Sequence, residues 1–139
     1  MRTLVIAALL ITTTSIYAQT PDPNAGNQEL TLQRFAVQGK KSILGSYYSL
    51  KMDCTPTEWQ DVKILKAPDN GEAKLVENYP TFANYNPPNP RTKCNGEKIK
   101  ATAMEYTPTK GYVGEDAIVA EVINDSGQRS VLKYAIVVK

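Results

Sequence analysis

The sequence contains no histidine and only two cysteines in 139 residues. Without histidine, Ser-His-Asp and Cys-His catalysis are excluded, and so are His-ligated zinc sites. Two cysteines alone cannot build a tetrahedral structural zinc site. A catalytic mechanism would therefore have to use carboxylates, or tyrosine and lysine.

The spacing of the acidic residues does not match a pattern for carboxylate catalysis either. Glu115 and Asp116 are adjacent, so on an extended chain they point to opposite faces, whereas a hydrolytic pair must converge on one bond. The acidic segments also lack the alternating oxygen ligands of an EF-hand loop. We therefore predict no catalytic residue, no metal site and no cofactor, and a protein that is not an enzyme.

Excess charge of one sign is missing as well. The chain has 16 basic and 14 acidic side chains, and removing Arg2 with the leader described below leaves 15 against 14, a net charge of +1. This balance gives no electrostatic footprint for nucleic acid or for an anionic membrane. We expect neither as a partner.

The long apolar run of this sequence lies at its N-terminus. Residues 1–18 carry Arg2, an apolar core from Leu4 to Ile11, and Ala18 where a signal peptidase would cut. The run is shorter than the roughly 20 residues that span a bilayer, so a cleaved signal peptide is favoured over a membrane anchor. We expect a secreted or periplasmic protein with no membrane insertion after cleavage.

The chain has two cysteines, Cys54 and Cys94, which is an even number, and it carries a predicted signal peptide. An oxidising compartment favours their pairing as a disulfide, which would close a loop of about 40 residues and contribute on the order of 4 kcal/mol. The alternative, a redox or nucleophilic thiol, has no CxxC motif and no histidine base to support it.

Amphipathic helical stretches are also absent, and short runs with a period of two, separated by proline and glycine, predict strands. Residues 19–29 are polar and predict a flexible lead-in to one domain at 30–139. The predicted fold class is all-β, a two-layer antiparallel sandwich of about seven strands. We expect strands near residues 30–37, 42–52, 59–66, 73–77, 101–107, 116–123 and 129–138.

Two segments have the residue types that are typical of tight hairpin turns. Asn70-Gly71 within residues 68–73, and residues 124–128, offer the backbone freedom of a tight hairpin. Asn124 to Ser126 also matches a glycosylation sequon, which we interpret as chance in so tight a turn. Trp59 is expected in the core or at a sheet end rather than as a ligand platform.

The segment from Tyr106 to Asp116 is predicted to be a structural corner. The strand ends at Pro108, Gly111 and Gly114 let the backbone cross from one sheet to the other, and Asp116 can accept hydrogen bonds from backbone amides. A ligand loop is the alternative interpretation of the same glycines.

This segment resembles the bacterial immunoglobulin-like and cadherin-like domains, in which Tyr-x-Pro is followed by Gly-Tyr/Phe-x-Gly-x-Asp. The resemblance covers roughly residues 60 to 139 and implies an Ig-like β-sandwich of the kind used as spacers or adhesive modules on secreted proteins. The matching residues are Tyr106, Pro108, Gly111, Tyr112, Gly114 and Asp116, with Pro68, Gly71, Ala73 and Leu75 in an upstream Pro-x-x-Gly turn.

The chain departs from this pattern in a Pro-rich and aromatic insertion at 79–95. A stiff loop tied down at Cys94 lowers the entropy cost of presenting side chains to a partner, and Tyr79, Phe82, Tyr85 and Arg91 are its candidate binding residues. Alternatively, the aromatic rings only cover an open end of the sandwich.

We therefore expect a non-enzymatic binding or structural module, of the adhesive or spacer kind that the resemblance implies, with a protein or cell-envelope component as its partner. A secreted inhibitor of a hydrolase, acting through the 79–95 loop, is the second hypothesis. Material that co-purifies with the protein would separate them, because a module retains envelope material or sister chains and an inhibitor retains one hydrolase.

Overall fold

The structure is a computed structural model that describes the backbone of residues 27–57 and 61–139, and the side chains from Glu29 onward within those ranges. The predicted signal peptide at 1–18, most of the predicted lead-in, and Trp59 lie outside the described residues. No helix in the described part of the chain is long and apolar enough to cross a membrane.

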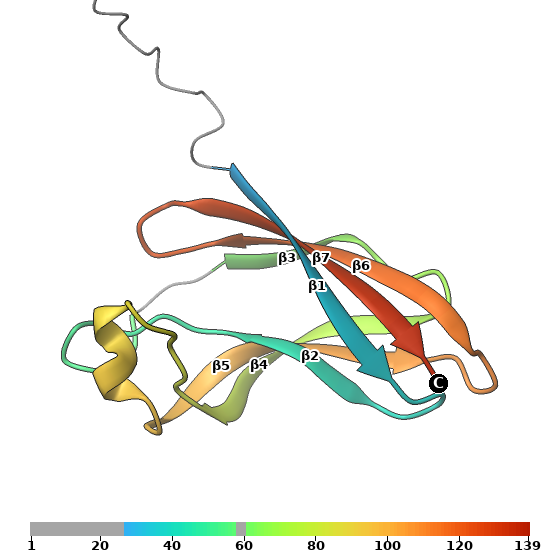
Figure 1. Cartoon of the computed structure of the whole chain (residues 1–139), viewed down its shortest axis with the longest axis horizontal. Helices are drawn as coiled ribbons and strands as arrows, with labels where there is room; N and C mark the ends of the chain where they lie inside the picture. The colour runs from blue at the N-terminus through green and yellow to red at the C-terminus, as the bar shows by residue number, and fades with distance from the viewer. Residues whose placement is uncertain (1–26, 58–60) are drawn as a thin grey trace, which may run out of the picture.

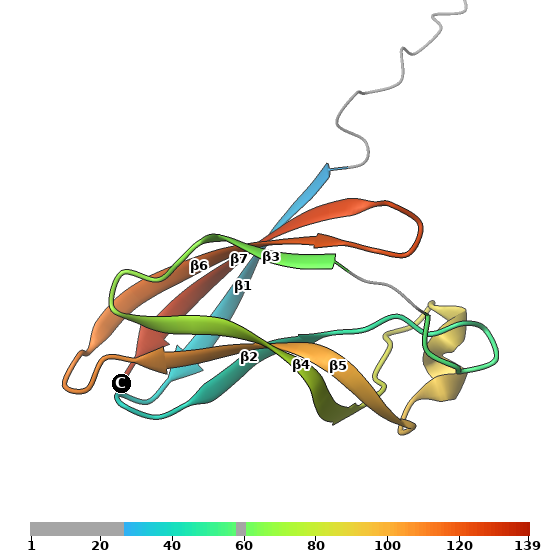
Figure 2. The ribbon, with the colours of Figure 1, turned by 180° about the vertical axis from the view of Figure 1, so that it is seen from behind.

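The fold is all-β, as predicted, and consists of two sheets that face each other in Figures 1 and 2. One sheet has the strand order β1-β7-β6-β3, and the other has the order β2-β5-β4. The elements are β1 (Asn27–Ala36), β2 (Ser42–Tyr47), β3 (Asp61–Lys66), β4 (Gly71–Phe82), the 3-10 helix η1 (Pro90–Cys94), β5 (Lys98–Pro108), β6 (Gly114–Ile123) and β7 (Arg129–Val138).

Each predicted strand is present, with differences at the boundaries. β1 begins at Asn27, so the last residues of the predicted lead-in are strand, and β2 ends at Tyr47 rather than near residue 52. One pairing also departs from a purely antiparallel sandwich, because β1 runs parallel to β7. The other strand pairs are antiparallel.

The core lies between the sheets, and in β5, β6 and β7 it is built from alternate residues, as the period-two pattern predicts. β6 contributes Ile118 and Ala120, and β7 contributes Tyr134, Ile136 and Val138, all at most 1% exposed. Met104 and Tyr106 of β5, and Leu44 and Tyr47 of β2, come from the opposite sheet. The hydroxyl groups of Tyr47 and Tyr134 form a buried hydrogen bond across the core, which satisfies both polar groups.

The segment at 68–73 is not a hairpin, contrary to the sequence prediction. β3 belongs to one sheet and β4 to the other, so this segment crosses between the layers. Gly71 is needed for a close approach, because a Cβ there would lie 2.6 Å from the ring of Tyr106. Residues 124–128 do form a hairpin, since they join the antiparallel strands β6 and β7.

The segment from β5 to β6 also crosses between sheets, and its glycines have positive φ. Gly111 has φ +86° and Gly114 has φ +139°. A Cβ on Gly114 would lie 3.0 Å from the hydroxyl oxygen of Tyr112, which donates a hydrogen bond to the carbonyl of Glu115. Both the backbone conformation and the neighbouring ring therefore disfavour a side chain at this position.

Gly114→Val is expected to destabilise the fold by about 2 kcal/mol, because a β-branched side chain is strained at this positive φ and also crowds the hydroxyl of Tyr112. Thermal denaturation measures the effect. Val113→Ala is the matched control, because the neighbouring Val113 is 61% exposed and should be neutral. An unchanged melting curve for Gly114→Val would contradict a structural role for this glycine.

Candidate functional site

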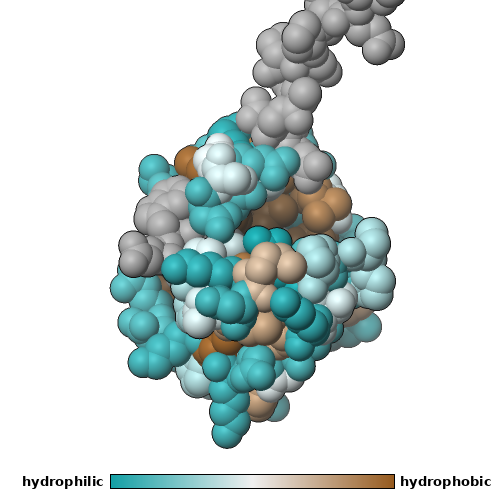
Figure 3. Space-filling model, turned by 90° about the vertical axis from the view of Figure 1, so that its left-hand side faces the viewer, coloured by the Kyte–Doolittle hydropathy of each residue, from teal (hydrophilic) through white to brown (hydrophobic). Residues whose placement is uncertain are grey.

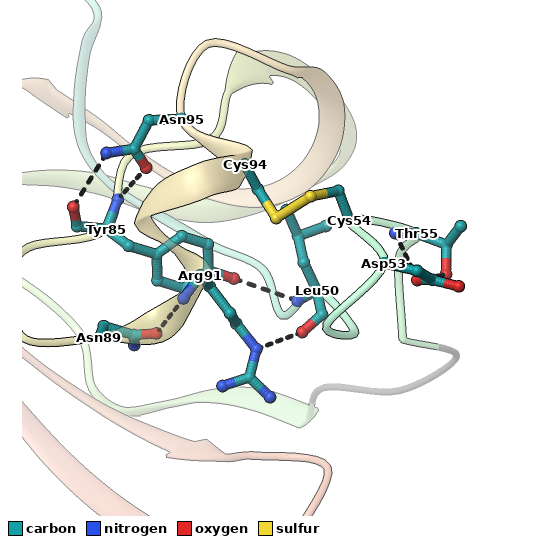
Figure 4. The surroundings of a disulfide bond; sticks show 9 residues. All are labelled: Leu50, Asp53, Cys54, Thr55, Tyr85, Asn89, Arg91, Cys94 and Asn95. Atoms are coloured by element: carbon teal, nitrogen blue, oxygen red, sulfur yellow. Dashed lines mark hydrogen bonds between the residues drawn. A yellow bond between two sulfur atoms is a disulfide. The ribbon is translucent and has the colours of Figure 1, made fainter.

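A disulfide closes one end of the sandwich. Cys54 and Cys94 are bonded, with their Cα atoms 5.4 Å apart, which confirms the predicted pairing. The bond joins the segment that follows β2 to the loop between β4 and β5, and Figure 4 shows this region. We call residues 48–57 and 83–97 together the braced end.

The braced end has a small hydrophobic core of its own. Leu50, Ala83 and Cys94 of the braced end and Ile99 of β5 are all buried, and Cys94 has no exposed surface. Tyr48, Cys54 and Tyr85 pack against this cluster and are partly buried. The loop is therefore anchored by packing as well as by the disulfide, which explains why a segment rich in proline and polar residues is ordered.

Leu50 connects the two segments through its backbone. Its N–H donates to the hydroxyl of Tyr85 at 3.1 Å, and its carbonyl accepts from Nε of Arg91 (Figure 4). Asn95 pairs with the backbone of Tyr85 through both ends of its side-chain amide, at 2.7 and 3.0 Å. These bonds fix the positions of the Tyr85 ring and of the Arg91 guanidinium.

Burial raises the pKa of the Tyr85 hydroxyl above its usual value. Its ring meets that of Tyr48 edge to face, with centroids 5.5 Å apart and an interplanar angle of 80°. The Tyr48 hydroxyl is itself engaged with the backbone of Asn84, donating to its carbonyl and accepting from its N–H. The two tyrosines therefore hold the loop against the segment after β2.

The four predicted loop residues lie in two different parts of the structure. Tyr85 and Arg91 lie in the loop, but Tyr79 and Phe82 belong to β4, where they pair with Ala101 and Lys98 of β5. The prediction of a loop from residue 79 is therefore wrong for its first residues. Pro80 is compatible with β4 because this is an edge strand, where a missing N–H is tolerated.

An apolar groove surrounds Phe82, whose side chain is 58% exposed. The groove has a volume of about 580 Å³, and its lining includes two lysines but no acidic residue. We call this surface the apolar groove. It is lined by Pro56, Pro80, Thr81, Phe82, Lys98, Ile99 and Lys100.

A second hollow, the polar cleft, lies between the braced end and the β6–β7 turn and has a volume of about 490 Å³. A smaller pocket of about 240 Å³ shares Pro56 and Lys100 with the apolar groove and shares Tyr48 and Ser49 with the polar cleft. The polar cleft is lined by Tyr48, Ser49, Tyr85, Asn89, Arg91, Asn124, Asp125 and Ser126.

The adjacent acidic residues Glu115 and Asp116 differ in their burial. Glu115 is exposed and Asp116 is buried, so the adjacent carboxylates face opposite directions, as expected for an extended chain. Among the described residues, no group of three or more His, Cys, Asp or Glu side chains is placed to hold a metal ion.

The residues of the β6–β7 turn that line the polar cleft carry no signal of binding in the sequence. Asn124 accepts hydrogen bonds through Oδ1 from the N–H groups of Ser126 and Gln128, so its presence is explained by turn formation. Nothing in the local sequence links this turn to a loop more than thirty residues away.

No protein-family model matches the sequence, and no curated protein matches it. The apolar groove and the polar cleft are therefore the surfaces on which a proposal of function rests.

Proposed function

We propose that this chain is a secreted or periplasmic, non-enzymatic binding module of the Ig-like type, adhesive or structural, that contacts its partner through the apolar groove. The observation that carries the proposal is the exposed ring of Phe82, 58% accessible, in a groove beside a disulfide-braced cluster. Aromatic side chains held in position at a surface are frequent anchors of protein interfaces.

The lining of the groove indicates the chemistry of the partner. Lys98 and Lys100 flank the apolar residues, and no carboxylate lines the groove. A complementary surface presents an apolar side chain surrounded by acidic groups, as a protein or a cell-envelope component can. Because the strands and the disulfide already fix the groove, little entropy is lost when the partner binds.

Secretion is supported by two independent features. Residues 1–18 have the composition of a signal peptide. The Cys54–Cys94 disulfide is typical of oxidising compartments. The resemblance of residues 106–116 to the immunoglobulin-like and cadherin-like pattern supports the Ig-like assignment.

Phe82→Ser is expected to weaken partner capture about 30-fold, the effect of losing one interface anchor. Immobilised parent and variant are incubated with envelope fractions and culture medium of the producing cell, and the bound material is identified and titrated. Val113→Ser is the matched control, because Val113 is similarly exposed at 61% but lies in the β5–β6 corner. Both variants should keep the parent melting temperature.

Equal capture by the parent and by Phe82→Ser would contradict the proposal. Equal losses in Phe82→Ser and Val113→Ser would also contradict it, because the groove would then have no special role. The rings of Phe82 and Tyr85 need separate tests, since Tyr85 packs on the buried cluster of the braced end and Phe82 is exposed.

A secreted inhibitor of a hydrolase is the second candidate function. The observation that favours it is the stiffness of the loop, which holds three prolines and η1 between β4 and β5 and is tied to the scaffold by Cys94. The captured material discriminates the two functions. An inhibitor captures one hydrolase and abolishes its activity at an equimolar ratio, whereas a binding module captures envelope material or sister chains.

A further inference from the structure

The polar cleft has two walls that come from distant parts of the sequence. Tyr85, Asn89 and Arg91 of the braced end form one wall, and the β6–β7 turn from Asn124 to Ser126 forms the other. Figure 3 looks onto this end of the molecule, where hydrophilic side chains predominate and hydrophobic ones show between them. A volume of about 490 Å³ is in the size range of sites for small molecules.

The cleft has hydrogen-bonding capacity that the described residues leave unused. The Arg91 Nε donates to the carbonyl of Leu50, but no acceptor within residues 29–57 and 61–139 pairs with the two terminal nitrogens of its guanidinium. In the same part of the chain, the Asp125 carboxylate accepts one long hydrogen bond, from the Ser49 hydroxyl at 3.4 Å. A strong donor and a strong acceptor are thus available on opposite walls.

The charges of the cleft select against an ionic ligand. Arg91 and Asp125 are the charged residues of the lining, and they have opposite signs and do not form an ion pair. An anion would be attracted to one wall and repelled by the other, and the same is true of a cation. A neutral ligand that both donates and accepts hydrogen bonds satisfies both walls.

The tyrosines add mainly apolar surface. The Tyr48 hydroxyl both donates to and accepts from the backbone of Asn84, whereas the Tyr85 hydroxyl accepts from the N–H of Leu50 and keeps its own O–H donor. Their rings, set at 80° to each other, are therefore the main surface that these residues offer to a ligand. A ligand that fits has one apolar C–H face and a dense set of hydroxyl groups at its edge.

We propose that the polar cleft is a binding site for a neutral oligosaccharide. One pyranose ring packs its C–H face on a tyrosine ring, while adjacent hydroxyls donate to the Asp125 carboxylate and accept from the Arg91 guanidinium. The site is preorganised, because the disulfide and the Leu50 hydrogen bonds fix one wall and the Asn124 turn bonds fix the other. This proposal does not depend on the apolar groove or on its partner.

The test is a titration of the ¹⁵N-labelled protein with maltohexaose, cellohexaose, mannohexaose and chitohexaose, each up to about 10 mM, which detects even millimolar affinity. At least one sugar is expected to give saturable shifts of backbone amides at residues 48–50, 85–91 and 124–126. Asp125→Ala should weaken that binding about tenfold or more. Glu97→Ala is the matched control, because Glu97 is an exposed acid of the braced end that does not line the cleft.

Asp125 is exposed in a turn, so the spectrum of Asp125→Ala should match the parent outside that turn. Asp125→Asn, which keeps the shape of the side chain, should weaken binding in the same direction. The absence of saturable shifts with all four sugars would overturn the proposal. So would shifts outside the cleft, unchanged affinity in both Asp125 variants, or binding of zwitterionic triglycine in place of the sugars. None of these outcomes bears on capture through Phe82.

Discussion

Cys54→Ser is expected to lower the melting temperature by about 15–20 °C, because the 40-residue separation of the two cysteines corresponds to about 4 kcal/mol of loop-closure entropy. The substitution also leaves the thiol of Cys94 unpaired in a cluster where this residue has no exposed surface. Thermal denaturation measures the effect. Met52→Ala, a change at an exposed neighbour, should leave the curve unchanged.

Hydrogen exchange shows where the lost stability acts. The braced end has its own small cluster, so its amides should lose protection before those of β6 and β7 in Cys54→Ser. Two titratable thiols in the freshly isolated parent, measured under denaturing conditions, would contradict the bond itself. A melting temperature within a few degrees of the parent would contradict its stabilising role.

The central strands are the part of the fold that the sequence predicts well. β6 and β7 each have one neighbour on either side and bury one face, so the apolar residues must fall at every second position. Ile118 and Ala120, and Tyr134 and Ile136, follow this rule and are buried. The strands at these positions are therefore visible without knowledge of their partners.

The crossing between β3 and β4 could not be predicted from local residues. Asn-Gly is compatible with a hairpin, but whether the next strand folds back depends on what holds the turn. Here the Asp116 carboxylate accepts hydrogen bonds from the N–H groups of Asp69 and Asn70, 47 and 46 residues away in sequence, respectively. A long-range contact therefore determines the path of the chain.

The extension of β4 was missed because its pattern is interrupted. The register with β5 shifts between Val76 and Tyr79, and Asn78 in that interval has φ +56°. Such a bulge breaks the alternation that marks a strand, and Pro80 then suggests a loop. The exposed ring of Phe82 is consequently presented by a paired strand, which is more rigid than the predicted loop.

The binding surfaces were only partly visible in the sequence. Tyr85 and Arg91 lie in the predicted insertion, and both line the polar cleft. Asp125 comes from a hairpin turn whose composition is already explained by its geometry, so it carried no separate signal of binding. A site assembled from two loops of different strands becomes apparent only when the sandwich is formed.

A second large effect is expected for Asp116→Ala, which should reduce the free energy of unfolding by about 3–4 kcal/mol. The side chain is buried and accepts four hydrogen bonds of 2.8 to 3.0 Å, from the Tyr106 hydroxyl and the N–H groups of Asp69, Asn70 and Ala117. Removing the carboxylate leaves these donors without their acceptor. It also removes the hydrogen bonds that link the β3–β4 segment to the start of β6. Chemical denaturation measures the loss.

Tyr106→Phe is the companion variant, because it removes one donor to the same carboxylate and keeps the ring. It should cost about 1 kcal/mol, the usual net value of a single hydrogen bond, and leave the backbone contacts of Asp116 in place. Equal losses in Tyr106→Phe and Asp116→Ala would mean that the backbone amides contribute nothing, which would contradict the role of Asp116 in the crossing.

The dependence on pH gives a test that a loss of packing alone would not produce. Burial raises the pKa of Asp116, but the hydrogen bonds from Tyr106 and from the backbone amides outweigh it, so the pKa lies below its usual value. The stabilisation from this carboxylate is therefore complete above the unfolded-state pKa of about 4 and is lost as the pH falls through the lower folded-state pKa.

The side-chain amide in Asp116→Asn does not bind a proton in this pH range. The difference in unfolding free energy between parent and Asp116→Asn should consequently be largest near pH 7 and shrink toward pH 2. A difference that stays constant over this range would show that the charge of Asp116 does not hold the two sheet crossings together.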